Sequence, residues 1–232
     1  ADAHVNMAID EATLILVREG RVPPTVRIYC WDVPCYTVGY LQSIPAHSIR
    51  LVGEFVCVRR LTGGQACFHG GDLSYSVTVS LADTIIPSSV LGSYERISSG
   101  VIEGLRLLGI DARYAPPAGI RVGGHVVATA AQARHRGVLL HQGTIALESC
   151  GAEGTLALPC QVLAPLSDVV AGEAHINDVV KALGRGFERA LGVDLSRGGL
   201  YAKEKRLARQ LLREKYKRSE WNLAHLKDRN VR

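Results

Sequence analysis

The order of periodic segments along the chain is the feature that most constrains its fold. Apolar residues recur at helical spacing over residues 5–19 and, beyond a long stretch of β-rich runs, again over 94–108. Within that stretch, residues 73–81 alternate Tyr and Val with Ser and Thr, as expected for a strand with one buried face. We predict strands at 25–31, 36–41, 55–58, 73–81, 120–129 and 137–147, and helices at 5–19, 94–108, after residue 177 and at 202–216.

The same order separates two fold classes and predicts one main domain. A parallel α/β sheet alternates strands with helices, whereas here the strands follow one another in groups. We therefore predict an α+β fold, in which 120–129 and 137–147 form a hairpin that turns near 134–136. A chain of 232 residues that is 47% hydrophobic can bury one sizeable core, so we predict a domain over 1–202 and a basic helical extension over 203–232.

Positive charge is concentrated at the C-terminal end. Residues 203–232 contain 11 Lys or Arg and 4 Asp or Glu, so they carry +7 and the preceding residues carry −2 of the net +5. Such a tail can be a solvated helix face, attract an acidic partner or bind nucleic acid, and we favour the first. No stretch approaches the roughly 18 apolar residues of a membrane span, and the N-terminal segment has no secretory pattern. The sequence thus predicts a cytoplasmic protein with no membrane partner.

The cysteines show no metal-ligand spacing and no C-x-x-C pair, which excludes the common zinc motifs. Most lie in or beside β-rich runs, where small buried thiols are expected in a reducing compartment. The six are Cys30, Cys35, Cys57, Cys67, Cys150 and Cys160.

One loop concentrates the features of a ligand site. Residues 59–69 read Arg-Arg-Leu-Thr-Gly-Gly-Gln-Ala-Cys-Phe-His, between the strands predicted at 55–58 and 73–81. Two successive glycines let the backbone approach a ligand and expose its amides, and an arginine can grip a phosphate or carboxylate. A hairpin turn flanked by surface arginines explains the same residues equally well, because a Gly-Gly turn alone is a weak signal.

Wider context favours the ligand loop, because similar segments occur in order along almost the whole chain. The loop, with Asp-Leu-Ser-Tyr-Ser at 72–76, closely resembles the acyl-binding signature of the biotin/lipoate protein ligase family, and is nearest to its lipoate protein ligase and octanoyltransferase members. The further matches are Asn-Met-Ala-Ile-Asp-Glu-Ala at 6–12, Arg-Ile-Tyr at 27–29, Thr-Val-Gly-Tyr at 37–40, Ala-Ala-Gln at 130–132, Gly-Val-Leu-Leu-His-Gln-Gly-Thr at 137–144, Lys-Tyr at 215–216 and Glu-Trp-Asn at 220–222.

The resemblance implies a fold, ligands and partners. The fold is the class II aminoacyl-tRNA synthetase and biotin synthetase-like α+β domain, a mixed β-sheet flanked by helices. The ligands are lipoate or octanoate, with ATP and Mg²⁺ if the chain makes an acyl-adenylate. The partner is a protein with a lipoyl-acceptor domain, and a separate accessory subunit is a second partner that the family allows. By position, the acyl or adenylate site comprises Arg60, Thr62, Gly63, Gly64, Gln65, Ala66, His69, Ala130, Ala131, Gln132, His141 and Gly143.

The second signature of the family departs from its pattern here. Val126 stands where the family has a lysine that reaches the acyl carbonyl and phosphate, Gly119 where it has a metal-assisting aspartate, and Thr129 where it has a glycine. Losing one cationic contact of this kind costs roughly 100- to 1000-fold in rate, so slow adenylate formation is predicted. His125 adjoins Val126, but neighbours on a strand face opposite sides, which argues against its replacing the lysine. The usual Gln-His-Gly order is also changed to His-Gln-Gly at 141–143.

Two functions from different classes follow. The first is attachment of a lipoyl or octanoyl group to a lysine of the acceptor domain, through an acyl-adenylate or an acyl-enzyme. For the acyl-enzyme the candidate nucleophiles are Cys67, Cys150 and Cys160, although a buried thiol is usually inert. The second is a catalytically impaired member that binds the lipoyl ligand or a partner protein without ligating. Biotin ligation is disfavoured because the Gly-Arg-Gly-Arg loop is absent, and nucleic acid is not a predicted partner.

Overall fold

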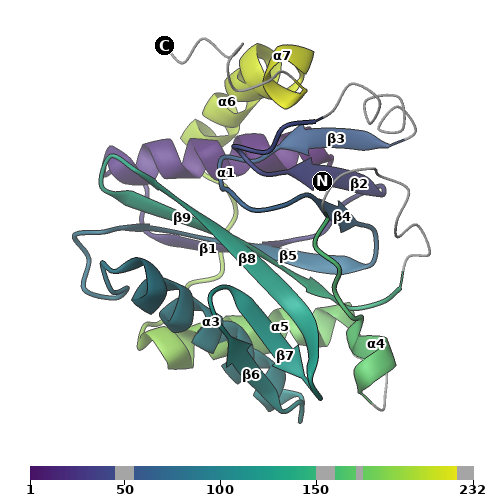
Figure 1. Cartoon of the computed structure of the whole chain (residues 1–232). Coiled ribbons are helices and arrows are strands. Elements are labelled where there is room, and N and C mark those ends of the chain that lie inside the picture. The colour runs from purple at the N-terminus through teal and green to yellow at the C-terminus, as the bar shows by residue number, and fades with distance from the viewer. Residues whose placement is uncertain (45–54, 150–159, 171–174, 224–232) are drawn as a thin grey trace.

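The computed structural model describes residues 1–44, 55–149, 160–170 and 175–223, and these residues form two β-sheets with helices around them (Figure 1). The larger sheet is antiparallel and has the strand order β1-β5-β9-β8-β7-β6. Its strands are β1 (Thr25–Tyr29), β5 (Asp72–Ser80), β6 (Ala112–Ala115), β7 (Gly119–Val122), β8 (His125–His135) and β9 (Val138–Ala146). The smaller sheet has the order β3-β2-β4, with β2 parallel to β3 and antiparallel to β4. Its strands are β2 (Cys35–Val38), β3 (Val56–Arg59) and β4 (Cys67–His69).

The two faces of the larger sheet are covered by different elements. Helices α3 (Val90–Leu107) and α5 (Ile176–Leu191) lie on one face, and α1 (Ala3–Arg18) crosses the other (Figure 1). Along β5, Tyr75 joins the main hydrophobic core beneath α3 and α5, whereas Ser76 on the opposite face bonds to α1. Burying one large apolar side chain contributes about 1.5–3 kcal/mol, so the apolar residues of the α3–α5 face contribute much of the stability of the sheet. The α1 face carries polar side chains such as Ser76.

The C-terminal helices continue the layer that α1 begins. They are α6 (Ala202–Leu211), the π-helical turn η1 (Leu212–Tyr216) and α7 (Ser219–Asn222), and the short α4 (Leu166–Val169) precedes α5 in the chain. Thr13 of α1 donates a buried hydrogen bond to Glu204 at 2.9 Å, and Lys215 pairs with Glu11 at 2.8 Å. The described part of the predicted basic extension is therefore anchored to the first helix.

The structure confirms the α+β class and most of the predicted elements, but it divides one strand. The strand expected at 120–129 is wrong, because Gly123 and Gly124 adopt φ angles of +54° and +88° and turn the chain between β7 and β8. The predicted hairpin with 137–147 is confirmed as β8 and β9. Parallel pairing occurs only in the smaller of the two described sheets, and the short strands β4 and β6 were not predicted. Within the ranges described, no helix is both long and apolar enough to cross a membrane.

Helices α3 and α5 cross where glycines bring their backbones together. A Cβ atom built on Gly186 would lie 2.3 Å from the carbonyl oxygen of Gly100 and 2.3 Å from the nitrogen of Gly104. The main chains of the two helices are therefore in contact, and no side chain fits at this point.

Gly186→Ala is expected to lower the free energy of unfolding by about 1–3 kcal/mol, because the added methyl group forces the helices apart. Gly184→Ala in the same helix is the matched control, since a Cβ there meets nothing within 4 Å. It should be neutral or stabilise by up to about 1 kcal/mol through helix propensity. Urea unfolding of both variants tests the crossing, and equal effects would contradict it.

Candidate functional site

A cavity of about 380 Å³ lies on the α1 face of the larger sheet, with walls from both sheets. Small or apolar side chains make up most of its described lining, including Met7, Ala130 and Ala131. That lining contains no Asp or Glu, and its permanent charges are the guanidinium groups of Arg60 and Arg121. Such a pocket suits an aliphatic chain that ends in an anionic or carbonyl group.

The loop that follows β3 is held in shape by its own arginine. Arg60 is buried, and its Nη2 donates to the carbonyl oxygens of Gly63 at 2.8 Å and Gln65 at 3.0 Å. Its Nη1 donates to Thr37 Oγ1 at 2.6 Å, and its Nε donates to Thr62 Oγ1 at 3.3 Å. A guanidinium has five N–H groups, so most of its donors order the loop.

The loop also approaches the smaller sheet backbone to backbone. Gly64 has a φ of +88°, which favours glycine. A Cβ atom built on Gly39, just after β2, would lie 1.9 Å from the carbonyl oxygen of Gly64. At Gly63, by contrast, an added Cβ meets nothing within 4 Å. The Gly-Gly pair was predicted to approach a ligand. The close contact that the structure shows is between Gly64 and a third glycine, Gly39, which was not among the predicted site residues.

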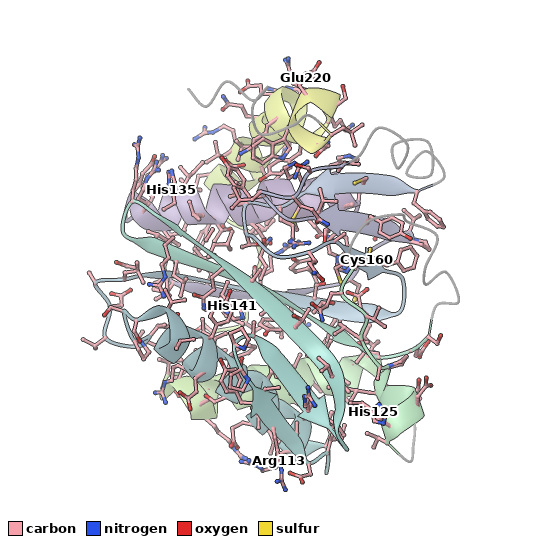
Figure 2. The ribbon with its side chains drawn as sticks, viewed as in Figure 1. Arg113, His125, His135, His141, Cys160 and Glu220 are labelled. Atoms are coloured by element: carbon pink, nitrogen blue, oxygen red, sulfur yellow. The ribbon has the colours of Figure 1, made fainter. Side chains whose placement is uncertain are left out.

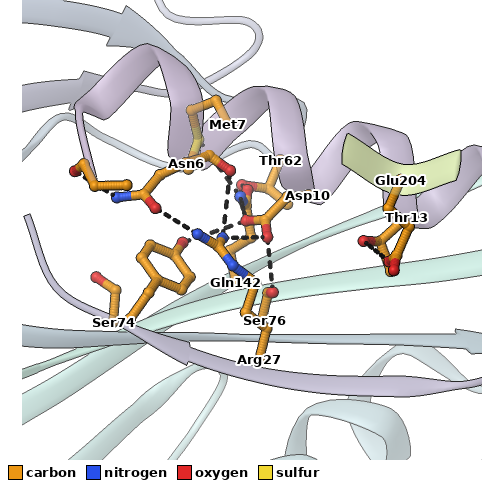
Figure 3. A network of polar contacts seen from close by, with 12 residues as sticks. Asn6, Met7, Asp10, Thr13, Arg27, Thr62, Ser74, Ser76, Gln142 and Glu204 are labelled. Carbon is orange, nitrogen blue, oxygen red and sulfur yellow. Dashed lines mark hydrogen bonds and ion pairs between the residues drawn. The ribbon is translucent and has the colours of Figure 1, made fainter. Parts of the chain in front are cut away.

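A buried polar network joins this loop to α1 and β9 (Figure 3). Thr62 donates to Gln142 Oε1 at 2.8 Å, and Gln142 Nε2 donates to Asp10 Oδ2 at 2.7 Å. Asp10 also pairs with Arg27 at 2.8 Å and accepts from Ser76 at 2.9 Å. Leaving a buried charge without its partner costs about 3–5 kcal/mol, so the network holds Gln142 firmly at the cavity wall.

His69 lines the cavity from β4, and both of its ring nitrogens have partners. Nδ1 lies 2.7 Å from Asp72 Oδ2, and Nε2 lies 2.9 Å from Thr37 Oγ1. Because the carboxylate of Asp72 can only accept, Nδ1 carries the hydrogen in the neutral form of the ring, and Nε2 then accepts from Thr37 Oγ1. Burial raises the pKa of Asp72, but its electrostatic interaction with His69 and the hydrogen bonds that the carboxylate accepts hold that pKa below its usual value. Trp31 stacks on the ring with centroids 4.1 Å apart.

Strands β7 and β8 form a second wall. Arg121 pairs with Val126 across the two strands, and Gly119 pairs with Thr129, and all four line the cavity. Directly paired residues share one face of a sheet, so this face carries a guanidinium beside the valine. His125 at the start of β8 is exposed and lies outside the described lining (Figure 2).

His141 lies behind the wall and not in it. Gln142 and Thr144 line the cavity, and because successive residues of a strand alternate, His141 faces the core beneath α3 (Figure 2). Its Nε2 lies 3.3 Å from Tyr75 Oη, and its Nδ1 lies 3.0 Å from Gln132 Nε2. Complete burial lowers the pKa of His141 to about 3, so the ring is neutral near neutral pH.

The three candidate cysteines differ in position. Cys67 lines the cavity on the same strand as His69. The backbone of Cys160 forms an isolated parallel β-bridge with Ala66, beside the loop. Burial raises the pKa of the Cys160 thiol, which disfavours a thiolate. Cys150 lies outside the described residues. In the part of the chain with described positions, no group of three or more His, Cys, Asp or Glu side chains could hold a metal ion.

The structure brings together seven of the twelve predicted site residues at the cavity wall. Those that line it are Arg60, Gly64, Gln65, His69, Ala130, Ala131 and Gly143, and those beside or behind it are Thr62, Gly63, Ala66, Gln132 and His141. The prediction did not include the lining residues Trp31, Arg121 and Gln142. For Arg121 in β7 and Gln142 in β9, the signal is the strand register, because it decides which alternate residues face the cavity. Trp31 follows β1, and no strand pattern selects it.

The fold and the pocket define a class of protein: an α+β domain with a mostly small and apolar cavity flanked by guanidinium side chains. The chain belongs to the lipoyl protein ligase A/B catalytic domain family, whose model matches residues 2–188.

Similar proteins include enzymes of two kinds. An octanoyltransferase LipM from Kyrpidia tusciae is 35% identical, over 95% of this chain and 94% of that protein. A crystal structure of lipoate-protein ligase A bound with ATP is 26% identical with a TM-score of 0.83, over 97% of this chain and 95% of that one. A bi-partite lipoate protein ligase from Thermoplasma acidophilum, studied with its E2 lipoyl domain, is 26% identical with a TM-score of 0.80, over 98% of this chain and 94% of that one.

Gly39→Ala is expected to weaken octanoate binding roughly 10-fold or more, because relieving a backbone clash costs about 1–3 kcal/mol and displaces the loop. Gly63→Ala is the matched control and should bind as the wild-type protein does. Calorimetric titration with octanoate measures both, and unchanged binding by Gly39→Ala would show that the contact with Gly64 is dispensable.

His141→Gln is expected to make folding less sensitive to acid. The unfolded histidine has a pKa of about 6.5, and the folded one a pKa of about 3. Between these values the unfolded state binds more protons, so the stability of the wild-type protein falls as pH falls. Relative to the variant, which cannot titrate here, the wild-type protein should lose about 2 kcal/mol between pH of about 7 and about 5. Urea unfolding at the two pH values provides the measurement, and parallel losses would contradict the burial of a neutral ring.

Proposed function

We propose that this chain transfers an octanoyl group from a thioester donor to the side-chain amine of a lysine in a lipoyl-acceptor domain. The observation that carries the proposal is the cavity, whose small and apolar lining leaves a slot for an aliphatic chain. Transfer of an octanoyl group is favoured by the relative named as an octanoyltransferase, because the similarity covers 94% of that protein. The T. acidophilum ligase and its E2 lipoyl domain favour an acceptor of that kind.

We assign the acyl chain to the residues of the cavity with the least side chain. Gly64, Ala130, Ala131 and Gly143 line it with at most a methyl group each. Gly143 exposes its main chain to the cavity and cannot carry a side chain on its core face, because an added Cβ would lie 2.3 Å from the buried Tyr75 ring. Among the other predicted residues of the loop, Arg60, Thr62 and His69 shape and order the polar side of the slot through their side-chain hydrogen bonds.

The transfer exchanges one acyl bond for another. The lysine amine attacks the thioester carbonyl carbon, the C–N bond forms, the C–S bond breaks, and the leaving thiolate takes the proton that the amine loses. Through an acyl-enzyme the exchange occurs twice, first onto a cysteine thiol and then onto the lysine. Negative charge develops on the carbonyl oxygen in each step, so a cation near that oxygen lowers the barrier.

The ATP-dependent route of a ligase fits the described cavity less well. Mg²⁺ is bound by oxygen ligands, usually including carboxylates, and no carboxylate lines the described wall. Val126 offers no charge to a phosphate. The proposal therefore uses no metal ion, and free lipoate or octanoate with ATP and Mg²⁺ forms the alternative to be tested beside it.

The purified chain is expected to modify an acceptor domain when supplied with an octanoyl thioester of a carrier protein and no ATP. Intact-mass spectrometry should show one added octanoyl group, and an acceptor with arginine at the target lysine should stay unmodified. A hydroxylamine-sensitive adduct on the chain itself would identify the acyl-enzyme route.

A second set of reactions separates transfer from ligation. It contains free octanoate or lipoate, ATP and Mg²⁺, with and without a candidate accessory subunit like the second part of a bi-partite ligase. Modification in this set alone would replace the proposal by ligation, and no modification in either set would refute both.

A further inference from the structure

The cavity contains two guanidinium groups, and they are used differently. Arg60 gives four hydrogen bonds to the loop and to Thr37, so it acts as part of the framework. Arg121 lines the same cavity from β7, and its side chain is exposed there. Its hydrogen bond within the described chain runs from Nη1 to the carbonyl oxygen of Gly124, at 3.3 Å. Arg121 is therefore the cation of the described lining that has most donors left for a ligand.

The surroundings of Arg121 do not explain it as a structural residue. In the strand register, Arg121 lies directly opposite Val126 of β8 on one side and Arg113 of β6 on the other. Like charges placed directly opposite each other destabilise a sheet. Arg113 forms an ion pair with Asp111 at 3.0 Å, whereas within the described ranges Arg121 forms no ion pair. A charge kept at some cost to the sheet, on the wall of an apolar pocket, indicates a role toward a ligand.

We propose that Arg121 binds the oxygen atoms at the head of the acyl substrate and stabilises the negative charge that develops on its carbonyl oxygen. The inference rests on the acyl transfer proposed above and assigns a specific residue to it. The geometry favours it because Val126, beside Arg121 on the same wall, is uncharged, so Arg121 supplies the cation from the neighbouring strand. A guanidinium suits the task, because its planar N–H groups can grip a carboxylate or a carbonyl oxygen.

Arg121→Gln removes the charge and should lower the rate of octanoyl transfer by about 100-fold, with most of the loss in kcat, because one such contact acts mainly in the transition state. Its unfolding midpoint in urea should be unchanged or higher, since a like-charge pair is lost. Arg113→Gln is the matched control, because Arg113 occupies the paired position on β6, lies outside the described cavity lining and is at the edge of the sheet (Figure 2). It should transfer at the wild-type rate.

Relocating the charge tests the chemistry of the role. Arg121→Gln combined with Val126→Lys returns a cation to the same wall, and it should regain at least roughly 10-fold of the lost rate. Wild-type activity in Arg121→Gln would overturn the proposal. Equal losses in Arg113→Gln and Arg121→Gln would also overturn it, because the effect would then reflect the sheet and not the cavity.

Binding separates this inference from the proposed reaction. Free octanoate carries a carboxylate at the position of the acyl head, so Arg121→Gln should weaken its binding about 10-fold in low salt, measured by calorimetry. If the wild-type protein transfers no octanoyl group but binds octanoate through Arg121, the proposed function fails and the assignment of Arg121 as the residue that binds the acyl head stands. If octanoate binds both proteins equally, that assignment fails whatever reaction the chain performs.

Discussion

The buried carboxylate of Asp10 is the interaction on which the site depends most. It forms an ion pair with Arg27 of β1 and accepts hydrogen bonds from Ser76 of β5 and Gln142 of β9. Gln142 in turn accepts a hydrogen bond from Thr62 of the loop. Four elements, α1, β1, β5 and β9, therefore meet at one charge that is almost completely buried, and the loop is joined to them through Gln142. Because an uncompensated charge in the interior is so costly, each segment is held where the others need it. The first helix thus contributes to the cavity mainly by fixing the strands and the loop that line it.

Strand alternation sorts the conspicuous polar residues into different environments. Arg59 and Arg60 are adjacent, yet Arg59 donates to Gly39 O at 2.7 Å and Trp221 O at 3.2 Å, away from the cavity that Arg60 lines. His141 and Gln142 separate in the same way, with one in the core and the other at the wall. The order His-Gln-Gly at 141–143 therefore places the glutamine, and not the histidine, at the cavity wall. A step of one residue is enough, because the side-chain period of a strand is two.

Much of the fold could be predicted from the sequence, and the site only in part. Long periodic segments such as 73–81 and 94–108 give their element type directly, because one face is apolar along several turns or pleats. The turn at Gly123–Gly124 was missed, since the β-branched residues on both sides indicate one strand. The loop at 59–69 was found because its glycines and arginines are adjacent in sequence. Arg121 was not, because its importance comes from lying across the ladder from Val126 and from the absence of carboxylates in the described lining, and both are properties of tertiary structure.

The contact between Gly39 and Gly64 has a consequence for chain-length selectivity. At Gly64 the cavity wall is main chain, and this main chain contacts that of Gly39 in turn. The width of the cavity at this point is therefore set by the distance between the loop and the smaller sheet. Substitution cannot widen such a boundary, since neither residue has a side chain to shorten. Ala131 lies across from it, 3.6 Å from a Cβ built on Gly64, and its methyl group can be removed or enlarged. In the acyl slot proposed above, the space open to a fatty group is therefore adjusted from β8, by the size of the side chain at position 131.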